Sequence, residues 1–114
     1  MPEYAFIFRR TAPVDPADLP TRNAAAREWA LALERRGLLR SAAPLQDEGR
    51  VVSARGVGSV SNTDPVASVL VVECESLDAA TSLVQGHPGL PFGVEIEIRP
   101  VKRVVPAPAR PSTP

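Results

Sequence analysis

The residue best suited to proton transfer in this 114-residue chain is His87, its single histidine. An imidazole with an ordinary pKa of about 6.5 can both take up and release a proton near neutral pH. A carboxylate within reach would orient the ring, and we take Asp64 as the candidate, with Asp15 as the alternative. His87 and Asp64 are therefore the candidate catalytic residues. The competing interpretation makes His87 a solvated turn residue between Gly86 and Pro88.

Three further side chains are candidates for substrate binding. Arg9, followed by Arg10, ends an apolar stretch, and a guanidinium there could bind a substrate carboxylate through two hydrogen bonds. The competing interpretation is that this pair only ends a strand and faces water. Trp29 and Tyr4 each join a large apolar body to a polar group, as residues lining a pocket often do, although the pattern around Trp29 favours core packing.

Several other chemistries find no support in the sequence. Cys74 lies in an apolar stretch with no base beside it, so we expect a buried, unreactive thiol rather than a nucleophile. The segment Gly56-Val57-Gly58 is not followed by a helix, as a phosphate-binding loop requires. No group of His, Cys, Asp or Glu has the spacing of metal ligands. We therefore expect no metal and no cofactor.

The amino-acid composition argues against nucleic acids and membranes as binding partners. Thirteen lysine and arginine residues balance thirteen aspartate and glutamate residues, so the net charge is zero. Without an excess of positive charge, we expect no binding to nucleic acid or to an anionic membrane. The apolar runs are too short to cross a bilayer, and the first ten residues do not resemble a signal peptide. We expect a cytoplasmic protein.

The elements that must position these residues alternate along the chain. Alternation of apolar side chains predicts a strand over residues 4–9, and three prolines then predict a loop through Pro20. Thr21 is the expected N-cap of a helix over residues 22–36, which Gly37 ends. The apolar stripe of that helix contains Trp29, and its charged back contains Arg27, Glu34 and Arg35.

The second half of the chain contains the clearest patterns. We expect strands over residues 38–45 and 50–54, then a flexible turn region over 56–65. The continuous apolar run 68–75 predicts a buried strand, and Ser76 should cap a helix that Gly86 ends. Strict alternation predicts a last strand over residues 94–99. One domain then covers residues 1–104, and residues 105–114 form a proline-rich tail, expected to be flexible.

This order of elements predicts an α+β fold. It is the ferredoxin-like βαββαβ arrangement, an antiparallel sheet with two helices on one face. The other face needs a cover, and the tail is too polar to supply one. We therefore expect a homodimer joined through the sheet faces. A charged residue at Ile96 is then expected to dissociate or unfold the protein.

Four segments together resemble the YCII-related family of the dimeric α+β barrel superfamily. They are the opening strand EYAFIFR, the helix exit ERRGLLRSAAPL, the unit VVECESLDAA and the ending GHPGLPFGVEIEIRPV. The resemblance covers nearly all of residues 3–104 and rests on the order and spacing of these segments. An Asp-Gly-Pro-Phe signature found in some members is absent, because the corresponding region reads SNTDPVASV.

The resemblance does not supply a catalytic pair. Some YCII-like proteins are thought to use a histidine on the first helix together with an aspartate after the second. In this chain Ala26 stands at about the position of that histidine, and His87 stands where the aspartate would be. Any catalysis must therefore use a different pair.

Three functions are compatible with these observations. The resemblance implies a small enzyme that acts on a small organic ligand by acid/base chemistry without a cofactor, of isomerase, lyase or cyclase type. It predicts an apolar cavity with His87 or Arg9 on its wall. A ligand-binding or accessory protein without chemistry would have the cavity but no residue with a shifted pKa. A protein-interaction module would instead expose an apolar patch beyond the dimer face.

Overall fold

The computed structural model describes residues 1–61 and 63–102. Four strands form one antiparallel sheet in the order β2-β5-β1-β6, and two short strands form a separate hairpin. The sheet strands are β1 (Glu3–Arg10), β2 (Leu39–Pro44), β5 (Val66–Glu73) and β6 (Val94–Pro100), and the hairpin strands are β3 (Arg50–Ser53) and β4 (Gly56–Ser59). The helices are α1 (Leu19–Arg35), α2 (Leu77–Gln85) and the short 3-10 helix η1 (Leu90–Phe92). The predicted ferredoxin-like α+β fold is confirmed. The tail over residues 105–114 lies outside the described residues.

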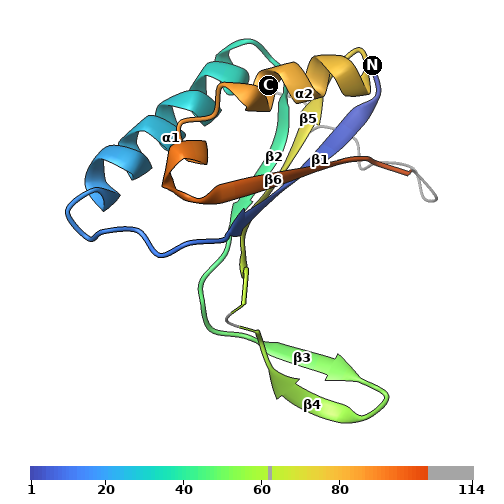
Figure 1. Ribbon diagram of the computed structural model, residues 1–114. Helices are drawn as coiled ribbons and strands as arrows, with labels where there is room; N and C mark the ends of the chain where they lie inside the picture. The colour runs from blue at the N-terminus through green and yellow to red at the C-terminus, as the bar shows by residue number, and fades with distance from the viewer. Residues whose placement is uncertain (62, 103–114) are drawn as a thin grey trace, which may run out of the picture.

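The hydrophobic core lies between the sheet and the two helices, which cover the same face of the sheet (Figure 1). Alternate residues of β1 point into it, and Phe6, the most enclosed of them, is 0% exposed. Phe6 stands opposite Leu70 of β5 and Ile98 of β6. From α1, Leu33 is buried and Trp29 packs against the core. The alternation seen in the sequence thus sets which side of each strand faces the helices.

Helix α1 begins three residues before the predicted start. Asp18 is its N-cap, although the Asp18 side chain makes no capping hydrogen bond, and Pro20 lies in the first turn. Proline is tolerated there because the first backbone N–H groups of a helix have no partner within the helix. The predicted end is confirmed, since Gly37 follows the last turn with φ at +72°, a conformation that favours glycine.

Helix α2 has the predicted N-cap. The Ser76 hydroxyl accepts a hydrogen bond from the backbone N–H of Ala79 at 3.0 Å. Ala80 and Val84 are buried, whereas Leu77 at the start of the helix is 47% exposed. The chain leaves α2 at Gly86 and turns through His87 into η1 and then β6. This turn places His87 beside the core.

The prediction for residues 50–65 was wrong in two respects. Residues 50–53 are a strand, but they pair with β4 rather than with the main sheet, and β4 lies where a flexible turn was expected. The hairpin projects from the ends of β2 and β5, away from the helices (Figure 1). Its side chains are exposed, including Val52 at 76% and Val57 at 69%. The hairpin therefore contributes nothing to the core.

The face of the sheet opposite the helices carries a central apolar strip. Ile7 of β1 stands opposite Val69 of β5, and Ala5 stands opposite Val71. Ion pairs border the strip. At one end Arg40 bonds Glu3 at 3.0 Å and Glu73 at 2.9 Å, and at the other Arg9 approaches Glu97 at 3.5 Å. We call the strip Ala5, Ile7, Val69 and Val71 the open sheet face.

Candidate functional site

A cavity of about 540 Å³ lies between α1 and the helix-facing side of the sheet. Side chains of α1, β1, β2 and β5 and the turn after α2 form its wall. We call it the His87 cavity. Its apolar wall includes Phe8, Trp29, Ala30, Leu70 and Val94. Its size and its mixture of apolar wall and few polar groups suit a small organic ligand.

His87 is a buried ring between two aromatic side chains, and it is 6% exposed. Its ring centroid is 4.7 Å from that of Trp29, in an edge-to-face arrangement, and 5.1 Å from that of Phe8. These distances are typical of favourable aromatic pairs. The interpretation of His87 as a solvated turn residue is therefore wrong.

A backbone hydrogen bond fixes the proton arrangement of the His87 ring. The N–H of Gly89 donates to Nδ1 at 2.9 Å, so Nδ1 carries no proton and the neutral ring carries its proton on Nε2. Nε2 has no hydrogen-bond partner within residues 1–61 and 63–102. The one fully enclosed side-chain nitrogen or oxygen without a partner in that range is Nε of Arg10. Nε2 is thus not sealed off, and its N–H can meet a ligand in the cavity.

Burial also sets the charge of this ring. It lowers the pKa of His87 to about 4, because a low-polarity surrounding disfavours the charged imidazolium. At neutral pH the ring is therefore uncharged. A neutral imidazole with its proton on Nε2 is a hydrogen-bond donor toward the cavity, suited to stabilising a ligand oxygen that carries negative charge.

Gly89 allows the backbone to approach this ring closely. A Cβ at position 89 would lie 3.0 Å from Nδ1 and Cε1 of His87 and 3.0 Å from a methyl group of Val94. A side chain there would push the imidazole or break the Gly89 hydrogen bond. The sequence analysis did not single out Gly89, although the spacing His-Pro-Gly places a backbone N–H two residues after the histidine, where such a bond forms.

The structure brings two of the three predicted binding residues to the cavity. Trp29 and Arg9 line it. Tyr4 is 6% exposed within the core and does not line this cavity. Arg9 also approaches Glu97 at 3.5 Å on the opposite face of β6, so its charge is partly balanced.

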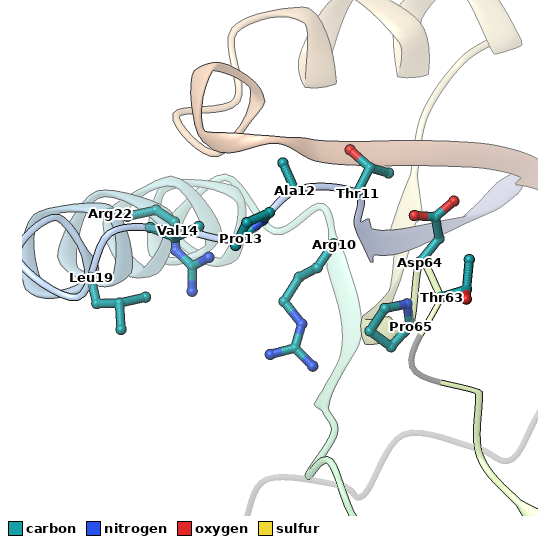
Figure 2. A pocket seen from close by; sticks show the side chains of 10 residues that line it. All are labelled: Arg10, Thr11, Ala12, Pro13, Val14, Leu19, Arg22, Thr63, Asp64 and Pro65. Atoms are coloured by element: carbon teal, nitrogen blue, oxygen red, sulfur yellow. The ribbon is translucent and has the colours of Figure 1, made fainter.

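The predicted carboxylate partners are not beside His87. Asp64 does not line the His87 cavity but two neighbouring ones of about 490 and 640 Å³, both of which also contain Arg10. In Figure 2 the Asp64 carboxylate and the Arg10 guanidinium point in opposite directions. The Asp15 side chain accepts a hydrogen bond from the backbone N–H of Ala17 at 2.9 Å, so it stabilises the turn in which it lies. Asp64 thus does not line the cavity that contains His87.

Two cavity residues were missed by the sequence analysis. Arg22 and Arg27, both from α1, line the His87 cavity. Arg27 is exposed, in agreement with its predicted place on the charged back of the helix, and it also lines this cavity. An arginine extends far from its backbone, so a position at the border of the apolar stripe can still reach a cavity beside the helix.

Cys74 is 4% exposed, and burial raises the pKa of its thiol, as expected for an unreactive cysteine. No cluster of three metal-binding side chains occurs within the described part of the chain. None of the helices over residues 1–61 and 63–102 has the length and apolar character needed to cross a membrane.

Comparison with known proteins shows the fold and leaves the family open. No protein-family model matches the chain, and no curated protein is significantly similar to it in sequence. One similar solved structure is the 5-chloro-2-hydroxyhydroquinone dehydrochlorinase of Burkholderia phenoliruptrix, in complex with 2,5-dihydroxybenzoquinone. The match has a TM-score of 0.52 and 21% sequence identity, and it covers 86% of this chain and 93% of the other. It shows that the two chains share a fold.

Proposed function

We propose that this chain is a YCII-like protein that acts on a small organic molecule by acid/base chemistry without a cofactor, in the His87 cavity. The observation that carries the proposal is the buried His87 ring, which lines the cavity and keeps the Nε2 proton available. The shared fold with a dehydrochlorinase that binds a dihydroxybenzoquinone supports a small ring compound as ligand. The proposed reaction is of isomerase, lyase or cyclase type.

The family part of the proposal has a geometric support. Ala26 and His87 occupy the two positions that hold the acid/base pair in some YCII-like proteins, and both line the same cavity. The His87 cavity therefore lies where the resemblance predicts an active site, but its wall contains Ala26 and His87 in place of the histidine and aspartate of those proteins. A cytoplasmic location belongs to the same proposal, and the single buried cysteine, which forms no disulfide, agrees with it.

The role proposed for His87 is hydrogen-bond donation. The Gly89 bond occupies the Nδ1 lone pair, so Nε2 carries the proton and cannot accept another while this arrangement lasts. His87 would stabilise an enolate or phenolate oxygen that forms on the ligand. Asp64 is the candidate base, for a ligand that extends from the His87 cavity into a neighbouring cavity that Asp64 lines.

The lowered pKa of His87 favours an enzyme over a binding protein without chemistry. Perturbed pKa values in a cavity are typical of catalytic sites, although buried structural residues also have them. The third candidate, a protein-interaction module, has its own support in the exposed valines of the β3–β4 hairpin. Apolar side chains on a projecting hairpin are a possible docking surface.

The ligand proposal is tested by following the His87 ring protons by NMR between pH 3 and 8, with and without a library of small aromatic acids. We expect a free-protein pKa near 4, and we expect both the pKa and the ring chemical shifts to change when a compound binds. A His87→Gln variant, which lacks the imidazole, should bind the same compound at least about tenfold more weakly, since one hydrogen bond to a charged oxygen is lost. A ring that ignores every compound would contradict the proposal.

The proposal includes a homodimer joined through the open sheet face. The side chains of β1 and β5 that point away from the helices are apolar as well, and a second copy of the sheet would cover them. We expect a light-scattering mass about twice the 12.1 kDa of one chain. Replacing Val71 with glutamate should yield a folded monomer, because it places a charge in the apolar strip.

The matched control is Ile96→Glu. Ile96 stands opposite Phe8 and packs against the core on the helix-facing side, so a charge there should unfold the chain rather than dissociate it. A monomeric mass for the unmodified protein, or a Val71→Glu variant that stays dimeric, would contradict a dimer through this face.

A further inference from the structure

The polar part of the His87 cavity is strongly cationic. Four arginines line it, Arg9, Arg10, Arg22 and Arg27, and no aspartate or glutamate does. The remaining polar side chains in the wall, those of Asn23, Ser68 and His87, are neutral at pH 7. The balance of charge in the whole chain hides this local excess, which the sequence composition could not reveal.

Two of the four arginines are already paired with acids outside the cavity. Arg9 approaches Glu97 at 3.5 Å, and Arg10 bonds Asp47 at 2.6 Å. The other two have no acidic partner within residues 1–61 and 63–102. The Arg22 side chain bonds only the neutral amide oxygen of Asn23, through Nε at 3.3 Å and Nη2 at 2.9 Å, and the Arg27 side chain makes no ion pair or hydrogen bond within that range.

The uncompensated charge therefore comes from the first half of α1. Arg22 and Arg27 lie on the part of this helix that borders the cavity, together with Asn23 and Ala26. Figure 2 shows the Arg22 guanidinium on the same side of residues 11–14 as that of Arg10. A guanidinium at the edge of an apolar cavity recognises planar anions such as carboxylates, through its paired N–H donors.

The part of the cavity around His87 determines which chemical groups the other end of the ligand must carry. Trp29 and Phe8 offer ring surfaces, and His87 packs against both of them. The Nε2–H of His87 is a single donor, which suits one oxygen atom on a ring. A ligand that satisfies both ends has an anionic group at one end and an oxygen substituent at the other.

We infer that the ligand class of the His87 cavity is an aromatic carboxylate, bound by Arg22 and Arg27 through its carboxylate, with its ring oxygen toward His87. This inference rests on the proposed function, because it assumes that the His87 cavity is the ligand site. It makes Arg22 and Arg27 the residues that determine specificity for an anion.

The experiment compares two probes of the same shape, 4-hydroxybenzoate and 4-hydroxybenzamide, by calorimetry and by the NMR shifts of the His87 ring. The amide keeps the ring and the hydroxyl group but has no charge. We expect the carboxylate to bind at least about tenfold more tightly, and we expect Arg22→Gln and Arg27→Gln each to weaken its binding about tenfold, as for the loss of one charge-assisted hydrogen bond. Binding of the amide should not change.

Arg35→Gln is the matched control, since Arg35 lies in the last turn of α1, outside the cavity, and pairs with Glu28 at 3.7 Å. It should leave the affinity for both probes unchanged. If both probes bind equally and both shift the His87 ring, the inference is overturned while the ligand site stands. If neither probe binds to the unmodified protein, the inference and the proposed function fall together.

Discussion

Replacing Phe6 with alanine is expected to destabilise the protein by about 3–5 kcal/mol, the usual cost of removing a buried aromatic ring. Phe6 is 0% exposed, lies on a strand with a neighbour on each side, and has its ring centroid 6.4 Å from that of Trp29. Because a domain of this size is stable by only about 5–15 kcal/mol, the loss would bring the chain close to unfolding. Urea denaturation followed by circular dichroism measures the change.

Val52→Ala is the control for Phe6→Ala. Val52 is 76% exposed on the hairpin, so its truncation should change the free energy of unfolding by no more than about 0.5 kcal/mol. If Phe6→Ala cost no more than Val52→Ala, the core described here would be wrong.

The free energy of unfolding is expected to decrease by about 3 kcal/mol as the pH falls from 6.5 to 4, through His87 alone. The unfolded chain takes up this proton near pH 6.5, whereas the folded chain takes it up only near pH 4. Between these values the unfolded state binds more protons, so acid favours unfolding. The contribution of His87 is constant above this window, and below it the loss is complete.

Denaturation of the unmodified protein and of His87→Gln across this pH range separates the histidine from the carboxylates, which titrate in both proteins. The difference in stability between the two should depend on pH within the window and be flat above it. Parallel curves for the two proteins would mean that His87 is not buried as a neutral ring.

The sequence patterns that depend on near neighbours predicted the structure well. Alternation in β1 and β6, the Ser76 cap of α2 and the glycine after α1 all describe interactions within a few residues, and each is confirmed. The strand β3 was predicted, but β4 and its pairing with β3 were not, because β4 has only four residues and contains two glycines, which are rare in strands.

The site was harder to predict, because its parts come from distant segments. His87 stands between a glycine and a proline, which reads as an exposed turn, and only the approach of Phe8 and Trp29 buries it. The roles of Arg22 and Arg27 depend on where the far end of a long side chain lies, and helical periodicity describes only the direction in which it starts. Asp64 was a reasonable partner in sequence, but the fold places it at neighbouring cavities that His87 does not line.

The arginines of the His87 cavity also have a consequence for the molecule as a whole. Two of them, Arg22 and Arg27, have no acidic partner in the described part of the chain, so the cavity wall carries a local excess of positive charge although the net charge of the chain is zero. Such a local field raises the concentration of small anions at the cavity and the rate at which they associate, and added salt screens it. The association rate of an anionic ligand should therefore fall as the ionic strength rises, whereas that of a neutral ligand should not.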